Sequence, residues 1–255
     1  MKKFEKVIIS SLCGITLIGA IGLGVYSTNK KNNNGDLNQN NISNYEVAES
    51  TNNIKNINNK NIVLDLKSSL DYALDVTDKN VRKNNADYVI IGKIKSIDGS
   101  TNYNGKQNIY TSIFTYGQIE IETILKGNIS DSEIPFIRLG GDIQFSEYEK
   151  GLTTSQKEKM ELVNTLSRDE KENSYVSYSP EGDIKLEEGK TYLMYMNYNT
   201  DYEKYICTYM QYGTREIDTN TLNNGIQTAS NEANETEIKV KNNDTGEWEN
   251  LSDVF

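Results

Sequence analysis

The alternation of apolar and polar residues is most regular over residues 87–126, where two long β-strands are predicted around a polar loop. Residues 88–91 form a run of β-branched and aromatic side chains, and an alternating stretch follows from Gly92. This pattern predicts a strand buried on both faces at one end only, with a bulge or bend at the glycine. Residues 110–125 alternate more regularly, so they are predicted as the antiparallel partner strand.

Further strands are predicted after this hairpin, with one helix among them. Residues 133–139 alternate, and Pro135 suggests that part of this strand lies at a sheet edge. Residues 154–167 carry a thin apolar stripe, which predicts a helix lying on the sheet. Residues 191–199 and 205–212 are rich in tyrosine and methionine and predict a second hairpin.

Several shorter elements are also predicted. A capping box, formed by Thr153 with Gln156 or by Ser155 with Glu158, begins the central helix. Asp78 follows Thr77 as the N-cap signal of a short earlier helix.

Three segments have weaker patterns. Residues 62–74 fit either a short helix or an extended segment, and residues 168–173 are predicted as a loop. Residues 237–241 and 247–251 predict a small final hairpin anchored by Trp248.

Three strands, a helix and two strands is the element order of an OB-type barrel. The predicted fold class is therefore mainly β: an OB-like, five-stranded antiparallel barrel with a helix between the third and fourth strands. A β-sandwich is the alternative.

Three phrases in these strands carry a resemblance to a known family. ADYVIIGKI, IETILKG and EEGKTYLMYM resemble the strand phrases of netrin-like modules, the OB-type domains also found in tissue inhibitors of metalloproteinases. They are also similar to uncharacterised extracytoplasmic proteins of low-GC Gram-positive bacteria. The likeness covers residues 86–213 and implies the OB-type fold. The inhibitor family docks through a disulfide-tied N-terminal cysteine, which this chain lacks, so protease inhibition does not follow.

Residues 1–26 predict a membrane segment with its N-terminus in the cytoplasm. The first six residues include three lysines, and residues 7–26 carry no charge. About 20 apolar residues span a bilayer, and the basic end places the rest of the chain outside. We therefore expect a single-pass protein of the cell membrane with an extracytoplasmic C-terminal domain. The alternative is a signal peptide cleaved near Ser27, followed by secretion.

The remaining chain divides into three parts by composition. Residues 27–61 are dominated by Asn, Lys, Ser and Gly, which predicts a disordered tether. Residues 62–218 contain the predicted strands and form the extracytoplasmic β domain. Residues 219–255 are predicted as a polar tail that contains the final hairpin.

The residue types that are absent exclude several kinds of chemistry. The chain has no histidine, so Ser-His-Asp and Cys-His catalysis and histidine-ligated zinc are excluded. Of its 2 cysteines, Cys13 lies in the apolar leader and Cys207 in a predicted strand. No disulfide partner and no cofactor are therefore expected, and Cys207 is predicted as a small apolar filler.

The formal net charge of the chain is −10. An acidic chain without a basic stripe is a poor ligand for nucleic acid, because phosphate neutralisation supplies much of that affinity.

Tyrosines are denser in the second predicted hairpin than a hairpin requires. Half of their rings are expected in the core, and the others are predicted to line a groove that stacks on sugars or on a peptide. The candidate ligand-binding residues are Tyr195, Tyr198, Tyr205, Tyr209 and Tyr212.

A weaker candidate is a calcium loop with oxygen ligands at Asp98, Ser100, Asn102 and Asn104. This spacing is typical of calcium loops, although Tyr103 stands where a turn glycine is expected. A hairpin connection explains the same residues.

Acidic residues form three groups in predicted loops, and two opposed carboxylates suffice for glycoside hydrolysis without histidine. The groups are Asp142, Glu147 and Glu149; Glu181 and Asp183; and Glu187 and Glu188.

The sequence thus predicts a membrane-tethered extracytoplasmic module that binds an envelope protein or glycan and is not an enzyme. A carboxylate-dependent glycan hydrolase of the cell envelope is the alternative.

Overall fold

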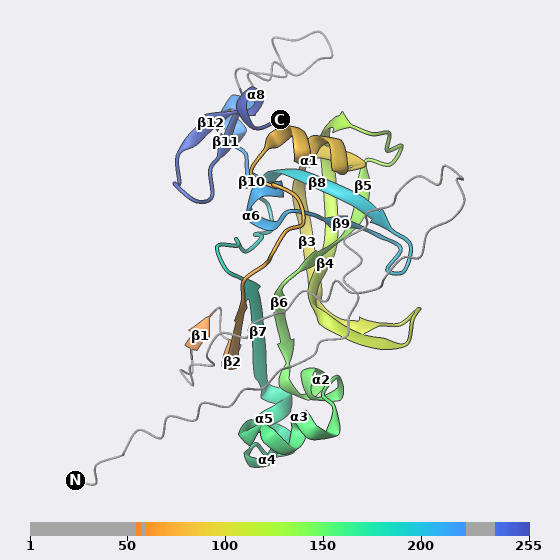
Figure 1. The fold of residues 1–255 in the computed structure, drawn as a ribbon, viewed down its shortest axis with the longest axis vertical. Helices are drawn as coiled ribbons and strands as arrows, with labels where there is room; N and C mark the ends of the chain where they lie inside the picture. Colours follow the sequence, from red (N-terminus) through yellow and green to blue (C-terminus); the bar gives the residue numbers. More distant parts are fainter. Residues whose placement is uncertain (1–54, 58–59, 223–237) are drawn as a thin grey trace, which may run out of the picture.

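The computed structural model describes residues 55–57, 60–222 and 238–255. They form a mainly β protein, with 48% strand against 23% helix, so the predicted mainly β class is confirmed. Figure 1 shows long strands at the centre, a smaller sheet with short helices below them, and the C-terminal hairpin above.

The strands of the described residues form a main sheet, a second sheet and a small hairpin. The main sheet consists of β3 (Tyr88–Asn104), β4 (Ile109–Lys126), β5 (Glu133–Leu139), β8 (Thr191–Asn199), β9 (Lys204–Cys207) and β10 (Thr214–Glu216). The second sheet consists of β1 (Lys55–Ile57), β2 (Lys60–Ser68), β6 (Gly141–Gln144) and β7 (Ser174–Pro180). The hairpin consists of β11 (Lys239–Lys241) and β12 (Trp248–Asn250).

The described helices are short, and four consecutive ones lie between β6 and β7 of the second sheet. They include α1 (Lys79–Asn85), α2 (Phe145–Lys150), α3 (Thr154–Lys159), α4 (Glu161–Thr165), α5 (Arg168–Asn173), α6 (Met210–Gly213) and α8 (Leu251–Val254).

Five strands of the main sheet pair in an order that returns to its start. β8 pairs with β3, β3 with β4, β4 with β5, β5 with β9, and β9 again with β8. The β5–β9 pairing is parallel, so the prediction of an antiparallel arrangement throughout is wrong at this contact. β10 is a sixth strand on β8, which the prediction of five strands missed.

The first half of β3 is buried on both faces, as its apolar run predicts. Ile90 and Ile94 belong to one group of buried side chains and Val89 and Ile91 to another. The inner cluster comprises Ile90, Ile94, Ile119, Ile129, Ile134, Phe136, Tyr192, Met194, Met196 and Cys207. The outer cluster comprises Ala86, Val89, Ile91, Leu193, Tyr195, Ile217, Leu222, Ile238, Val240, Leu251, Val254 and Phe255.

Gly92 lies at a close approach between β3 and β4. A Cβ atom at this position would lie 2.5 Å from Cγ2 of Ile119, closer than any side chain tolerates. The pairing register also shifts between Ile91 and Gly92, which confirms the predicted irregularity.

The second sheet joins the start of the domain to a long insertion between β5 and β8. β2 pairs in parallel with β7, and β7 pairs with β6. Residues 60–68 are therefore a strand. Of the two alternatives for residues 62–74, a short helix or an extended segment, the extended one is correct as far as Ser68. The insertion replaces the single predicted helix by two strands and four short helices. Neither the second sheet nor its pairing partners were predicted.

The predicted helix over residues 154–167 is broken in two. Met160 has an extended backbone (φ −87°, ψ 107°) and separates α3 from α4, while its side chain packs against the cluster around Phe145. The capping box of Thr153 with Gln156 is present. Residues 168–173 were predicted as a loop, but they form α5, which begins with a second capping box, Ser167 with Glu170.

The second predicted hairpin is correct over residues 191–199 and ends early on its return strand. β9 stops at Cys207, and Tyr209 and Met210 have positive φ values of 61° and 43°. This reversal begins α6, so Tyr209 and Tyr212 do not lie on a strand. The hydrogen bond from the Thr208 amide to the Tyr195 carbonyl oxygen (2.9 Å) holds the chain here before it turns away.

The C-terminal hairpin is present as β11 and β12, but its anchor is not the predicted one. Trp248 is 46% exposed, whereas Val240 and Leu251 are fully buried in the outer cluster. The outward position of Trp248 follows from the period of two along β12, because its neighbour in sequence faces the other way.

The predicted membrane segment over residues 7–26 and nearly all of the predicted tether over residues 27–61 lie outside the described residues. Within the part of the chain that the structure describes, no helix has the length and apolar character needed to cross a bilayer.

Candidate binding site

The five candidate tyrosines do not share one surface. Tyr195 is fully buried in the outer cluster, and its hydroxyl donates a hydrogen bond to the carbonyl oxygen of Val254 over 2.9 Å. Tyr209 packs beside it, with ring centroids 6.2 Å apart. Tyr212 lines a cavity at another place in the fold. Tyr198 and Tyr205 form a separate pair nearer the surface.

Tyr198 and Tyr205 belong to a three-ring surface that also includes Tyr88, here called the tyrosine surface. The ring of Tyr205 contacts both others edge to face, with centroid distances of 5.2 Å to Tyr88 and 5.3 Å to Tyr198. Tyr198 is 45% exposed. The three residues come from β3, β8 and β9, so the closed pairing order of the main sheet brings them together. Burial raises the pKa of Tyr205, so its hydroxyl stays neutral at physiological pH.

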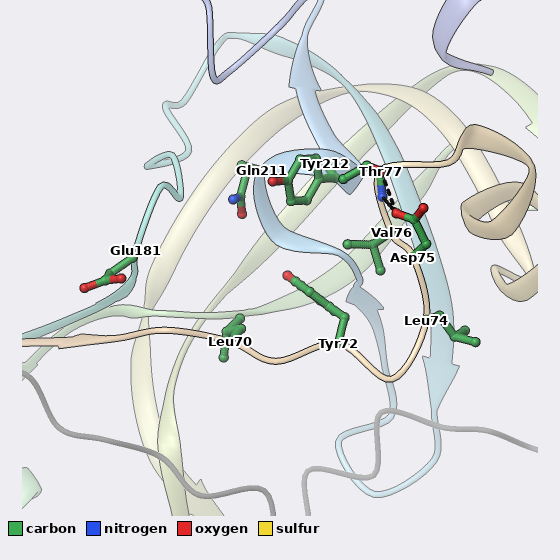
Figure 2. A pocket seen from close by; sticks show the side chains of 9 residues that line it. All are labelled: Leu70, Tyr72, Leu74, Asp75, Val76, Thr77, Glu181, Gln211 and Tyr212. Atoms are coloured by element: carbon green, nitrogen blue, oxygen red, sulfur yellow. Dashed lines mark hydrogen bonds between the residues drawn. The ribbon is translucent and has the colours of Figure 1, made fainter.

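A cavity of about 310 Å³ lies against residues 69–77, the segment that joins β2 to α1 and is here called the strap. Six lining residues come from the strap, one from the turn after β7, and two, Gln211 and Tyr212, from α6. Figure 2 shows the side chains of Tyr72 and Tyr212 on two sides of this space, with the Gln211 amide beside Tyr212. Leu74 and Asp75 lie at the other end.

The hydroxyl of Tyr72 is buried and has no hydrogen-bond partner among the described residues. Burial is the main cause of a raised Tyr72 pKa, and the negative charge of Asp183 adds to it. The phenol is therefore neutral and retains both its donor and its acceptor capacity.

A buried ion pair stands behind this hydroxyl. Nη2 of Arg138 lies 2.5 Å from Oδ1 of Asp183, and the two side chains are 5% and 2% exposed. Nη1 of Arg138 also donates to the carbonyl oxygen of Ile184 over 3.2 Å, and Ile184 packs against the inner cluster. The segment after β7 thus closes one end of the inner cluster through this pair.

Cys207 lies in the inner cluster near the same ion pair. Burial raises the pKa of its thiol to about 12, so the reactive thiolate does not form near neutral pH. This agrees with the predicted role of a small apolar filler.

The turn over residues 180–183 places two acidic side chains on opposite sides of the cavity wall. The amide of Asp183 donates to the carbonyl oxygen of Pro180 over 3.2 Å, and Gly182 has a φ of +72°, which favours glycine. A Cβ atom on Gly182 would lie 3.0 Å from Nε2 of Gln211. The turn therefore presses against α6, with Asp183 directed to Arg138 and Glu181 left at the cavity.

The calcium candidate is contradicted by the conformation of its residues. Asp98, Ser100, Asn102 and Asn104 all lie within β3 rather than in a loop. A strand advances about 3.3 Å per residue, which separates the first and last by roughly 20 Å, so the four cannot surround one ion. The amide oxygen of Asn104 instead accepts bonds from the backbone of residues 106 and 107, both over 3.1 Å.

The candidate carboxylates lie at separate places, and most of them are neutralised by a lysine. Asp142 pairs with Lys60 and Lys185, Glu147 with Lys150, Glu149 with Lys171, and Glu187 with Lys190. Glu188 accepts a hydrogen bond from the amide of Ile97 over 2.6 Å. Glu181 is the one candidate carboxylate that lines the cavity. No group of three or more Asp, Glu, Cys or His residues suited to a metal ion occurs in the described ranges.

Sequence reasoning did not select Tyr72, Arg138 or Gln211. A signal existed for Arg138, which shares a strand face with Ile134 and Phe136. A charge on an apolar face implies a buried counter-charge. No sequence pattern distinguishes Tyr72 or Gln211, because the strap and α6 meet only in the folded chain.

Comparisons with protein-family models, with curated proteins and with solved structures found no match to this chain.

Proposed function

We propose that the protein is a non-catalytic, extracytoplasmic binding module of OB type, tethered to the cell membrane by residues 7–26. The closed pairing order of β3, β4, β5, β9 and β8 supports the barrel, since each of the five strands has two partners within the set. The lysines and uncharged run at the N-terminus support the membrane tether. The resemblance of the strand phrases to netrin-like modules also motivates the proposal of an OB-type fold.

The observation that carries the binding role is the tyrosine surface. Tyr198 is nearly half exposed and stacks edge to face on Tyr205, so neither ring is fully used by the core. Partly exposed aromatic rings with polar tips suit a ligand that offers both C–H faces and hydroxyl groups. A glycan of the cell envelope is therefore the proposed ligand.

A non-catalytic role agrees with the chemistry available. The carboxylates that would serve a glycan hydrolase are mostly held in ion pairs with surface lysines, whereas hydrolysis needs an opposed pair facing the substrate.

The binding role is tested by sedimentation of the full-length protein, in detergent, with purified insoluble envelope glycan. The double variant Tyr198→Ala with Tyr205→Ala should bind at least roughly thirtyfold more weakly, because truncating an interface tyrosine costs about 2 kcal/mol. Tyr103→Ala with Tyr110→Ala is the matched control, since these rings are also exposed and paired, 5.1 Å apart. Equal losses in both variants, or no binding by the unaltered protein, would count against the glycan.

Protein partners are an alternative outcome of the same variants. If glycan binding is absent and cross-linking in cells yields a partner protein that depends on Tyr198, the surface binds protein instead.

The tether is tested by protease treatment of intact, wall-stripped cells, where a C-terminal tag should be digested. Resistance of the tag would contradict the extracytoplasmic orientation.

A further inference from the structure

We propose that the cavity beside the strap is a second binding site, which takes a small ligand carrying a primary ammonium group. This site is separate from the tyrosine surface: the residues that line it are distinct from Tyr88, Tyr198 and Tyr205. It goes beyond the proposed function, because it requires neither a glycan nor the membrane tether.

The walls of the cavity are held in place at both ends of the strap. The carbonyl oxygen of Ser68, just before the strap, accepts a bond from the amide of Glu181 over 2.9 Å. At the other end, Nη1 of the buried Arg82 donates to the carbonyl oxygens of Val76 and Thr77 over 2.7 and 2.9 Å. The strap therefore spans the opening between two fixed points.

The charges at the cavity favour a cation. Its lining contains two carboxylates, Asp75 and Glu181, and no lysine or arginine. Asp75 is occupied, because its Oδ1 accepts bonds from the backbone amide and hydroxyl of Thr77 over 3.1 and 2.5 Å. The carboxylate of Glu181 makes no hydrogen bond or ion pair with the described residues, and the side chain is exposed at the cavity. An anion would meet an uncompensated negative charge there.

The neutral polar groups complete the recognition of an ammonium ion. The unpartnered hydroxyl of Tyr72 can accept an N–H bond, and leaving such a buried group unsatisfied costs about 1–3 kcal/mol. The Gln211 amide lies on the same side of the cavity (Figure 2). The aromatic rings of Tyr72 and Tyr212 line the cavity, and the faces of such rings attract cations. The Arg138–Asp183 pair behind Tyr72 is already neutralised and does not reverse this preference.

The size of the cavity limits the ligand. A volume of about 310 Å³ is at the lower end for small-molecule sites, which span roughly 300–1,000 Å³. One sugar ring or one amino acid fits such a space, and a chain of several units does not. An amino sugar and a free basic amino acid share the required ammonium group.

Calorimetric titration of the full-length protein in detergent tests the proposal. Butylamine, butanol and butyrate have the same carbon chain and differ in charge, so the amine alone should bind. Glucosamine and lysine then distinguish the two sources, with glucose as the uncharged control. Equal binding of butanol and butylamine, or no binding of any amine at millimolar concentration, would overturn the proposal.

Substitutions separate recognition from folding. Glu181→Gln should weaken amine binding by roughly tenfold, the loss expected for one charge-assisted hydrogen bond, whereas Glu122→Gln, an exposed glutamate of β4 outside the cavity, should not. Tyr72→Phe should weaken binding without lowering the melting temperature, because its hydroxyl bonds nothing in the described chain. Unchanged amine affinity in Glu181→Gln would refute the site. Tyr198→Ala should leave amine binding intact, so failure of the tyrosine surface and failure of this site are distinguishable.

Discussion

The inner and outer clusters lie on opposite faces of the same strand and are closed in different ways. On the inner face, Ile90 and Ile94 meet side chains from β4, β5, β8 and β9, which pair with one another in the main sheet. On the outer face, Val89 and Ile91 meet Ala86 just after α1, residues that follow β10, and residues of the C-terminal hairpin and α8. The inner cluster is therefore closed by the sheet itself, and the outer one by segments that are remote along the chain.

The two clusters are expected to differ in how much they contribute to stability. The inner cluster ends in a buried ion pair between Arg138 and Asp183, whose removal would leave a charge without compensation. The outer cluster ends in apolar contacts of short elements, among them Leu251 and Phe255. Substitutions in the inner region should therefore cost more than comparable ones in the outer region.

The largest effect is expected for Asp183→Ala. It leaves the Arg138 guanidinium buried without its partner, which should lower the free energy of unfolding by about 3–5 kcal/mol. Urea denaturation measures the change. Asp142→Ala is the control, because its ion pairs with Lys60 and Lys185 are longer and partly exposed and should contribute little. A similar small loss in both variants would show that the inner region does not depend on this pair.

Gly117→Ala should follow, with a loss of about 3 kcal/mol from overpacking. An added Cβ would lie 2.0 Å from the carbonyl oxygen of Ser96, and backbone cannot move aside as a flexible side chain does. Gly105→Ala makes the same change where the nearest atom, on Tyr103, is 3.8 Å away, and thermal denaturation should detect almost no shift. Tolerance of Gly117→Ala would mean that the β3–β4 pairing is looser than the register indicates.

Leu251→Ala examines the outer region. Leu251 is fully buried in α8, and the lost contacts should destabilise the protein by about 2–3 kcal/mol. Trp248→Ala, three residues earlier and 46% exposed, should have little effect in the same urea titration. The reverse order of effects would restore tryptophan as the anchor of the C-terminal hairpin.

The smallest effect concerns Cys207 and alkaline pH. Its folded pKa of about 12 exceeds the ordinary thiol value of about 8.5, so folding favours the protonated form. This contribution to stability is complete below the ordinary value and is lost as pH rises from there toward the folded one. In a Cys13→Ser background, Cys207 should resist alkylation at pH near 8 and react once urea unfolds the chain. Rapid alkylation of the native protein would contradict burial in the inner cluster.

The dependence of stability on alkaline pH provides a second test of the burial of Cys207. Cys207→Ala removes the titrating thiol, so the variant should lose stability less steeply than the unaltered protein as the pH rises. Equal slopes would assign the alkaline loss to the buried tyrosines instead.

Much of the fold follows from local patterns. The β3–β4 hairpin, β5, β8, the irregularity at Gly92 and the capping box at Thr153 were all predicted, because period-two alternation and capping depend on residues close in sequence. The predicted helix over residues 154–167 failed at Met160, whose burial against the Phe145 cluster outweighed helical continuity. The return strand failed at Tyr209, where the backbone reverses into α6.

Local patterns along the chain predicted the mainly β class and most of the central strands, and the composition alone excluded histidine chemistry. The folded chain, in contrast, shows which faces of the strands are covered, that β2 and β7 lie side by side, and which tyrosines meet. Tyr72 and Gln211 are 139 positions apart, and Arg138 and Asp183 are 45 positions apart. No pattern along the chain encodes such meetings. They arise because burying apolar surface brings remote segments together, and the polar groups carried with them must then find partners in one another or in a ligand.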